Sequence, residues 1–593
     1  MGEGTIPLWG DLFTQDDINS AVKIFSIYAE HDEYMKHATT NPDLAKLFEL
    51  ARKTLIPSEK DLKERRRRRK QDKRDKDKEI LAVAGIRQMR KVKMVGYTGG
   101  SVDIPMPPRI GTQEANEAFA AEDEHRLITE TAAETSEVVE GEDRSSTKVA
   151  DGQTVTADTD PVLPPLRKLT YNRACHVCGK PFRELHHFYD QLCPTCADFN
   201  FMKRFSEADM HGRVCIVTGA RVKIGYCIAL KLLRMGAIVI VTTRFPHDAA
   251  SRYAKEPDFP SFKGRLAVYG VDFRDIPLMH HFCREITERF QRLDVIINNA
   301  AQTVRKPPAY YEHLIEGEAI DIPSDVRDVI DVVDVYRARN GGFIFGHGGR
   351  NALPASAVAR LEEVIEDEEG VRSLGVALPA KQAIAHLPEV NMSAAMSQLA
   401  LIDSDVKPTA KVFPPGLYDR DDQQVDLRGE NSWTHELGQI STVEMMECHV
   451  INTFAPWILI SELKPLMERT AKVDGTDGIC DKFVVNVSAM EGQFYRNKTI
   501  YHPHTNMAKA ALNMMTRTAS AGFAAVNIFM TAVDTGWITD ENPVDQWHKR
   551  EHAPPPLDEW DAAMRVLDPV LMGVRGEEKL WGAFLKNYRP TRW

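Results

Sequence analysis

Residues 213–225 read RVCIVTGARVKIG and join two hydrophobic patterns that belong to different secondary structures. The apolar run Val214–Val217, rich in β-branched residues, is typical of a buried strand, whereas the segment after Gly225 carries apolar residues at helical spacing. Thr218 and Gly219 end the first pattern and predict a tight turn. A glycine turn at a helix N-terminus presents backbone N–H groups and a favourable dipole to an anion. The stretch therefore predicts a strand–turn–helix unit that binds phosphate.

The bulk composition narrows the class of protein. The chain has 593 residues, enough for more than one domain, and its 43% hydrophobic and 27% charged residues are typical of a soluble globular protein. A formal net charge of −11 argues against nucleic acid as the partner of the whole chain. There is no apolar run long enough to cross a membrane and no recognisable signal peptide. Nine cysteines, four of them in two C-x-x-C pairs, suit a reducing compartment, so we expect a cytoplasmic protein.

The N-terminal part is expected to lie outside the main fold. Residues 1–60 have helical periodicity and predict a helical arm that packs or binds a protein partner. Residues 61–165 predict a charged, disordered linker, because they contain few aromatic residues to bury. Within the linker, Lys63–Lys78 reads KERRRRRKQDKRDKDK, which is typical of a solvated charged helix or linker. A nuclear localisation signal and an RNA-contacting arm are the alternatives for this run.

Two C-x-x-C pairs with fourteen residues between them predict a small zinc ribbon over residues 166–206. Four thiolates can converge on one tetrahedral ion and organise a segment too small for a core of its own. A site with four protein ligands has no open position, so we expect a structural Zn²⁺ and a surface that could engage a protein partner. The expected ligands are Cys175, Cys178, Cys193 and Cys196.

The second predicted strand, Ala237–Arg244, ends where a dinucleotide-binding domain selects its cofactor. A site for NAD places an acidic residue there, but this chain has a threonine followed by Arg244. A cation suits the 2′-phosphate of NADP, and Arg221 and Lys223 in the glycine loop act in the same direction. We therefore expect NADP(H), with a surface salt bridge as the alternative role of Arg244. The third predicted strand ends at Asp272, placed to accept a hydrogen bond from an adenine amino group.

The order of these motifs resembles the short-chain dehydrogenase/reductase family. The segment TGARVKIG is followed by Asp272 and then by NNAA at 298–301, and the resemblance covers residues 212–304 and 441–593. It implies a doubly wound sheet, a nicotinamide cofactor, and assembly into dimers or tetramers. The chain departs from the family where Lys223 replaces a glycine and where an alanine ends the NNAG motif.

The cofactor contacts that these motifs and the resemblance imply come from both halves of the domain. They are Thr218, Gly219, Arg221, Lys223, Ile224, Gly225, Arg244, Asp272, Asn299, Ala300, Lys509 and Thr539.

Asn452, Ser488 and Lys509 match three members of the family's catalytic quartet. The resemblance implies that Asn452 holds a water in a proton relay, that Ser488 hydrogen-bonds the reacting oxygen, and that Lys509 binds the nicotinamide ribose. The family's tyrosine, four residues before the lysine, is replaced by Thr505. An aliphatic hydroxyl cannot be tuned toward neutrality as a phenol can. We therefore expect the proton to be handled by Tyr501, just outside the predicted helix, or by Thr505. Further candidates for the missing acid are Tyr495, His502 and His504.

Residues 305–440 exceed what the family needs and predict an insertion over the active site, because open α/β sheets bind ligands beyond the carboxyl ends of their strands. Part of the insertion, Asp325–Arg339, is expected to be helical. A substrate pocket could be shaped by Gln302, Thr303, Arg305 and Trp433. A packing flap or an oligomer contact is the alternative.

The predicted fold class is α/β: a doubly wound Rossmann-type parallel sheet with a large insertion, preceded by a small zinc ribbon and a disordered charged region. The predicted domain order is arm 1–60, linker 61–165, ribbon 166–206, first half of the main domain 207–304, insertion 305–440, and second half with the C-terminal segment 441–593.

The function that these patterns favour is an NADP-dependent oxidoreductase acting on a carbonyl or alcohol. The alternative is a nucleotide-binding pseudoenzyme that engages proteins through its ribbon and arm, as the replacements at Thr505 and Lys223 suggest. A third, weaker alternative is an RNA-associated factor. The sequence indicates neither the substrate nor the reaction direction.

Overall fold

The computed structural model of the chain describes residues 59–87, 167–328, 330–334, 391–406, 411–419, 421–469, 481–495, 498–539, 541–543 and 554–593, and a few isolated ones before position 50. The chain divides into two compact units, one of residues up to Ala82 with 169–171, and one of the remainder from Val83. The predicted arm, most of the predicted linker and the middle of the predicted insertion lie outside the described residues. No helix in the described part of the chain has both the length and the apolar character needed to cross a membrane.

The first unit is built on α5 (Glu59–Ala82), which contains the charged run expected to be a helix or linker. Most of its described side chains are exposed. Within the helix, Arg68 donates to Glu64 at 3.2 Å, one turn away, and such pairs support an exposed helix. The backbone N–H of Thr170 donates to Asp77 Oδ1 at 2.6 Å. The run is therefore a solvated helix, as its composition indicates.

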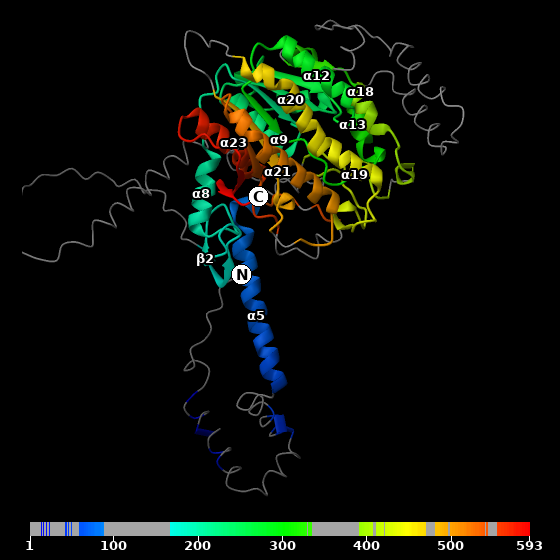
Figure 1. Cartoon of the computed structure of the whole chain (residues 1–593). Helices are drawn as coiled ribbons and strands as arrows, with labels where there is room; N and C mark the ends of the chain where they lie inside the picture. The colour runs from blue at the N-terminus through cyan, green and yellow to red at the C-terminus, as the bar shows by residue number, and fades with distance from the viewer. Residues whose placement is uncertain are drawn as a thin grey trace, which may run out of the picture. The chain divides into compact units, whose positions relative to one another are not determined.

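Figure 1 draws the whole chain, coloured from the N-terminus to the C-terminus. The second unit contains a nine-stranded sheet in the order β11-β10-β9-β8-β6-β3-β4-β5-β7. Neighbouring strands are parallel, except that β11 is antiparallel to β10. This is the predicted doubly wound parallel sheet. Its strands are β3 (Val214–Thr218), β4 (Ile238–Thr243), β5 (Leu266–Gly270), β6 (Val295–Asn298), β7 (Asp331–Asp334), β8 (Lys482–Ser488), β9 (Ile528–Asp534), β10 (Phe584–Lys586) and β11 (Arg589–Thr591).

Alternate residues of each strand point to opposite faces of the sheet. Because apolar residues point to both faces, helices cover both of them. On β3, Cys215 and Val217 join one buried apolar cluster, and Val214 and Ile216 join the other. Burying one such side chain contributes about 1.5–3 kcal/mol. The first cluster includes residues of α9 (Lys223–Arg234), α10 (Pro246–Ala254) and α23 (Glu559–Val574), and the second those of α12 (Ile276–Arg289), α20 (Ala455–Glu468) and α21 (Pro503–Ala524).

The helix expected over 325–339 is not formed in the part of this range that the structure describes, residues 325–328 and 330–334. The structure has a short helix, α14 (Ser324–Arg327), followed by the edge strand β7, in which Val332 pairs with Val268 of β5. The prediction was wrong because it took account of helical periodicity alone. The β-branched valines favour a strand here, since the open edge of the sheet offers them backbone hydrogen bonds.

Other described parts of the insertion pack near the carboxyl end of β4. The helices η1 (Pro308–Tyr311), α13 (Glu312–Ala319) and α18 (Met392–Ala395) contribute to a small buried cluster around Phe245, which follows β4. This part of the insertion therefore borders the edge of the sheet at which the predicted cofactor loop lies.

The predicted ribbon forms a β-hairpin and a helix. The strands β1 (Arg167–Ala174) and β2 (Pro181–Leu185) pair antiparallel, and α8 (Pro194–Arg204) follows. Residues 83–87 complete it, because the N–H groups of Gly85 and Ile86 donate to the carbonyls of His187 and Phe188, each at 2.9 Å.

Candidate active site and cysteine cluster

The glycine loop (residues 218–225) joins β3 to α9 at the centre of the sheet. Gly219 has a φ of +64°, and a Cβ placed on it would lie 2.9 Å from the Cα of Ala300. A Cβ on Gly225 would lie 2.5 Å from Asn299 Nδ2. The Thr218 hydroxyl accepts hydrogen bonds from the N–H groups of Asn299 and Ala300, both at 2.9 Å. The glycine loop and the NNAA motif therefore form one tightly packed backbone surface.

Lys223 occupies the position at which the family has a glycine, and its φ is 55°. A left-handed backbone costs a residue with a side chain about 1–2 kcal/mol, so Lys223 holds this conformation at an energetic cost. Lys223 and the half-buried Ile224 begin α9. Burial raises the pKa of Asp419, in the insertion, and the charge of Lys223 opposes that rise.

Arg244 contacts two aromatic rings at the end of β4. Its Nη2 donates to the hydroxyl of Tyr311 at 2.9 Å, and its guanidinium lies 4.5 Å from the centroid of that ring. The same guanidinium lies 5.5 Å from the centroid of Phe245. Within the described residues, the salt bridge considered as its alternative role does not form.

Arg221 lies against the same phenylalanine, 5.4 Å from the ring centroid of Phe245. It donates to Asp248 at 2.7 Å and to the side chain of Gln423 at 2.5 Å. Two cations from the two strand ends therefore flank one aromatic ring beside the glycine loop.

Asp272 is held by Arg274. The guanidinium Nε and Nη2 of Arg274 donate to this carboxylate at 3.0 and 2.7 Å, and the backbone N–H of Arg274 donates at 3.0 Å. Burial alone would raise the pKa of Asp272, but the neighbouring guanidinium lowers it below its ordinary value. A hydrogen bond from adenine would have to share a carboxylate that already accepts three donors.

A buried network of ion pairs continues from Arg274 into the insertion. Arg274 contacts Glu447 at 3.1 Å, and Arg305 contacts the other oxygen of Glu447 at 2.9 Å. Arg305 also binds both oxygens of Asp405, at 2.5 and 2.8 Å. Because the Arg305 side chain is buried and paired, the geometry favours a packing role over the substrate-pocket role considered from the sequence.

Asn452 lies in a π-helical turn, η5 (Val450–Phe454), between α19 (Thr442–His449) and α20. Its Oδ1 accepts from the backbone N–H of Gln302 at 2.7 Å, and its Nδ2 donates to the Gln302 carbonyl at 2.9 Å. π-Helical turns are frequent at functional sites. This amide fixes the chain just after the NNAA motif.

Lys509 and Ser488 lie together at the carboxyl end of β8. The Nζ of Lys509 donates to the carbonyl of Val487 at 2.8 Å, and burial lowers the pKa of this amine to about 8. Ser488 is buried, and its hydroxyl has no hydrogen-bond partner among the described residues. An unsatisfied buried hydroxyl costs about 1–3 kcal/mol, so this position favours a ligand that brings an oxygen or N–H group.

Thr505 and Tyr501 have different environments. Thr505 is buried one turn before Lys509 in α21, and its hydroxyl lies 3.4 Å from His504 Nε2. Tyr501 is 41% exposed and precedes α21, in a β-bridge with Glu436. Within the described residues, no hydrogen bond joins the Tyr501 hydroxyl to Ser488 or Lys509. The geometry therefore favours Thr505 over Tyr501 as the residue that handles the proton.

Sequence reasoning missed Cys448. It lies on α19, one turn before Asn452, and its Sγ lies 3.3 Å from Asn452 Nδ2 and 3.5 Å from the Gln302 carbonyl. Burial raises the pKa of the Cys448 thiol to about 11, while Lys509 and a hydrogen bond with Thr505 act to lower it. The i, i+4 spacing of Cys448 and Asn452 on one helix face could have identified it.

Thr539 belongs to segment 535–543, which follows β9 and of which the structure describes residues 535–539 and 541–543. Its hydroxyl donates to Glu541 at 3.0 Å, and Thr303 donates to the other oxygen of Glu541 at 3.1 Å. Because Thr303 follows the NNAA motif, this segment borders the candidate site.

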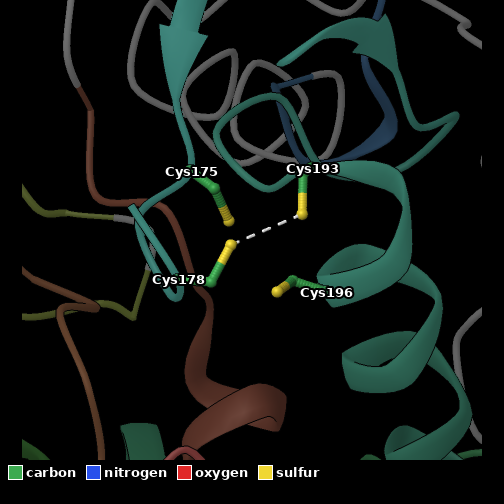
Figure 2. A group of neighbouring side chains, drawn as sticks. All are labelled: Cys175, Cys178, Cys193 and Cys196. Carbon is green, nitrogen blue, oxygen red and sulfur yellow. Dashed lines mark hydrogen bonds between the residues drawn. The ribbon is translucent and has the colours of Figure 1, made fainter. Parts of the chain in front are cut away.

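The four cysteines of the ribbon converge from two segments, one after β1 and one at the start of α8 (Figure 2). Their sulfur atoms all lie within 4.8 Å of one another, and Cys178 Sγ lies 3.8 Å from Cys193 Sγ. Tetrahedral thiolates about 2.3 Å from one zinc ion would lie about 3.8 Å apart. The cluster of Cys175, Cys178, Cys193 and Cys196 therefore could hold a metal ion.

Known proteins similar to this chain include enzymes and one uncharacterised protein. The family profile described as short chain dehydrogenase matches residues 213–316. The uncharacterized protein R665 of Acanthamoeba polyphaga mimivirus is 27% identical over 432 residues, 70% of this chain and 74% of that protein. Retinol dehydrogenase 14 of Mus musculus is 35% identical over 102 residues, which are 15% of this chain and 30% of the enzyme. The Pseudomonas aeruginosa RhlG/NADP active-site complex is 13% identical with a TM-score of 0.35, covering 64% of this chain and 95% of that chain.

The matched profile, the glycine and NNAA motifs and the strand order agree. Residues 213–316 therefore match the short-chain dehydrogenase family, and the similar stretch of Retinol dehydrogenase 14 belongs to an enzyme named as a dehydrogenase.

Proposed function

We propose that this protein is an NADP-dependent oxidoreductase that transfers a hydride between the nicotinamide and a carbonyl or alcohol. The observation that carries the proposal is the buried hydroxyl of Ser488, which has no hydrogen-bond partner among the described residues and follows directly after the Val487 carbonyl that accepts from Lys509. A carbonyl oxygen is the kind of group that such a hydroxyl would bind.

The residues of the glycine loop fit the nucleotide part of the cofactor. The loop ends at the N-terminus of the twelve-residue helix α9, which favours an anion, and Gly219 and Gly225 leave no Cβ between the backbone and its neighbours. Arg244 and Arg221 would hold the 2′-phosphate, since both guanidinium groups flank Phe245 beside this loop.

The bound cofactor would supply the hydride, and the protein would orient the substrate and manage one proton. Ser488 would hold the reacting oxygen, and Lys509 would bind the ribose and place a positive charge near that oxygen. Thr505 would pass the proton. Thr505 also contacts the thiol of Cys448, whose S–H group would be a second proton donor next to it. Asn452 would keep the segment after β6 in place through Gln302.

The second candidate function is a nucleotide-binding pseudoenzyme. Thr505 favours it, because no tyrosine stands in the buried cluster to supply the family's acid. Such a protein would bind NADPH but transfer no hydride to any carbonyl in a broad substrate panel.

Titration calorimetry with NADPH and NADH tests the cofactor. We expect Arg244→Glu to weaken NADPH binding about 10- to 100-fold, the range for loss of a charge-assisted contact, and to leave NADH binding nearly unchanged. Lys263→Glu, the same charge reversal at an exposed turn residue, is the matched control. If the wild-type chain binds neither nucleotide, the proposed function is wrong.

We also propose that the four-cysteine cluster holds Zn²⁺ in a structural site. Four thiolates at these separations suit a tetrahedral ion. Metal analysis of the purified chain should give one zinc ion per chain, and Co²⁺ substitution should give the absorption of tetrahedral thiolate coordination. A chain that folds without metal and binds none would contradict this.

We propose a homo-oligomer as the assembled state. Large apolar side chains are exposed on two helices, with Trp457 of α20 at 62%, Met507 of α21 at 52% and Met514 of α21 at 57%. Contact with a second copy would remove these surfaces from water. Light scattering should give a dimer or larger species for the wild type and a smaller one for Trp457→Glu.

A further inference from the structure

The two segments that carry the cysteines also contact the C-terminal part of the chain. One is the knuckle Cys175–Cys178, and the other is α8, which follows Cys193 and contains Cys196. The contacts of each segment show what an ion at the cluster would hold in place.

The C-terminal end of α8 contacts the N-terminal end of α23 through buried ion pairs. Arg204 donates to both oxygens of Asp558, at 2.8 and 3.0 Å, and to Asp561 at 2.7 Å, and its side chain is fully buried. Asp558 is the N-cap of α23 and forms a capping box with Asp561. The hydroxyl of Tyr189, between the two cysteine pairs, also donates to Asp561. The position of the first turn of α23 therefore depends on the ribbon.

A second chain of hydrogen bonds begins at one of the cysteines. The backbone carbonyl of Cys196 accepts from Asn200 Nδ2 at 2.6 Å, and Asn200 Oδ1 accepts from Arg565 of α23. Arg565 is fully buried. Three residues further along α8, Lys203 pairs with Asp568 at 2.6 Å. Two turns of α23 are thus linked by hydrogen bonds and an ion pair to α8, which contains Cys196 and has Cys193 as its N-cap.

The knuckle contacts two parts of the C-terminal region, segment 535–543 and the residues that begin at Pro554. The ring of His176 lies 6.2 Å from that of Trp537, in segment 535–543. The backbone N–H of His176 donates to the carbonyl of Gln191 at 2.9 Å, and the Gln191 side chain donates to the carbonyl of Pro554. The knuckle is therefore linked both to segment 535–543 and to the approach to α23.

Segment 535–543 extends from these contacts to the candidate active site. Near its start, a Cβ on Gly536 would lie 2.6 Å from Leu557 Cδ1, so the segment rests on the residues before α23. At its end, Glu541 binds Thr303 at 3.1 Å, and its carbonyl accepts from Asn431 at 3.0 Å. One continuous series of contacts thus joins the cysteine cluster to the border of the site.

We propose that the metal-loaded cysteine cluster positions α23 and segment 535–543 against the candidate active site, so that loss of the ion loosens this border while the sheet stays folded. His176, Gln191 and Arg204 are the positioning residues. The ribbon is then an integral part of the oxidoreductase domain rather than a separate module for partner proteins.

Hydrogen–deuterium exchange of the full chain tests this directly. Treatment of the zinc-loaded protein with EDTA should raise exchange in segment 535–543 and in the first turns of α23. It should leave α12 unchanged, because α12 packs on the opposite face of the sheet. If EDTA raises exchange only in residues 172–204, the proposal is wrong.

A variant that keeps all four cysteines separates positioning from general instability. Metal-loaded His176→Ala should raise exchange in segment 535–543 about 2- to 10-fold, as expected for loss of one ring contact, and should still bind one Zn²⁺. His280→Ala, on α12, is the matched control. Gln191→Met should raise exchange around Pro554 in the same way. Wild-type exchange in both metal-loaded variants would overturn the proposal.

This readout does not depend on nucleotide binding. If the chain binds no NADPH but exchange in segment 535–543 follows the metal, the proposed activity fails and the positioning role stands. If NADPH binds and exchange in segment 535–543 is the same with and without the metal, the proposed activity stands and the positioning role fails.

Discussion

The Nζ of Lys509 donates a hydrogen bond to the carbonyl of Val487 at 2.8 Å, one residue before Ser488, whose hydroxyl has no hydrogen-bond partner among the described residues. The helix α21 and the strand β8 thus place an amine and a hydroxyl together in a buried environment. Burial disfavours the charged amine, which is why its pKa falls to about 8. Such an arrangement costs stability in the free protein.

The first prediction concerns this cost. The pKa of Lys509 is about 8 in the folded state and near 10.5 in the unfolded chain, so the unfolded state binds more protons between these values. Stability should therefore rise as pH increases from 8 to 10.5. Lys509→Met removes the charged group and should raise the free energy of unfolding at pH 7 by up to about 3 kcal/mol, while it abolishes NADPH binding.

Urea unfolding of both chains at pH 7 and at pH 10.5 checks this. The gain of Lys509→Met should nearly vanish at the higher pH. An equal gain at both values would mean that the ammonium is not the source of the cost.

The second prediction concerns the glycine loop. Gly225→Ala would place a Cβ 2.5 Å from Asn299 Nδ2 and 2.9 Å from the Cα of Ala220, so strand and helix must separate. We expect a loss of about 1–3 kcal/mol in stability and no measurable NADPH binding by calorimetry. Gly317→Ala in α13 is the matched control, because no atom lies within 4 Å of its added Cβ, and it should be neutral or stabilising.

The local parts of this fold could be predicted from the sequence. The unit β3–turn–α9 follows from a β-branched run, two glycines and a helical repeat, all within one short stretch. The cysteine cluster follows from the C-x-x-C spacing. Each pattern is complete within its own segment, so no long-range contact had to be known.

Contacts between distant segments could not be predicted in this way. Arg204 and Asp558 are 354 positions apart, and neither residue type signals a partner. The spacing of Cys448 and Asn452 places both on one helix face, but only the packing of α21 brings Thr505 beside the Cys448 thiol. The valines of β7 form a strand only because β5 leaves an open edge for them.

The third prediction concerns Cys448. Its thiol should titrate near pH 11, because burial raises its pKa. Because the pKa of Lys509 is about 8, its amine is already neutral at this pH, so Lys509→Met should leave the titration of Cys448 nearly unchanged. The thiolate absorbance of wild type minus Cys448→Ala isolates this group from the other cysteines. A thiolate that forms near neutral pH would show that Cys448 is more exposed or more strongly stabilised as an anion than the structure indicates.

The fourth prediction concerns the buried pair that joins the ribbon to α23. Arg204→Met leaves Asp558 and Asp561 without their guanidinium partner in a buried site, and breaking such a pair costs about 3–5 kcal/mol. Thermal unfolding should show a large loss, whereas Arg575→Met, which removes an exposed pair with Glu577, should change stability by less than about 1 kcal/mol. Because the carboxylates of Arg204→Met gain stability when they are protonated, the loss should be smaller at pH 5 than at pH 8. A loss that is equal at both pH values would show that the damage comes from packing rather than from the unpaired charges.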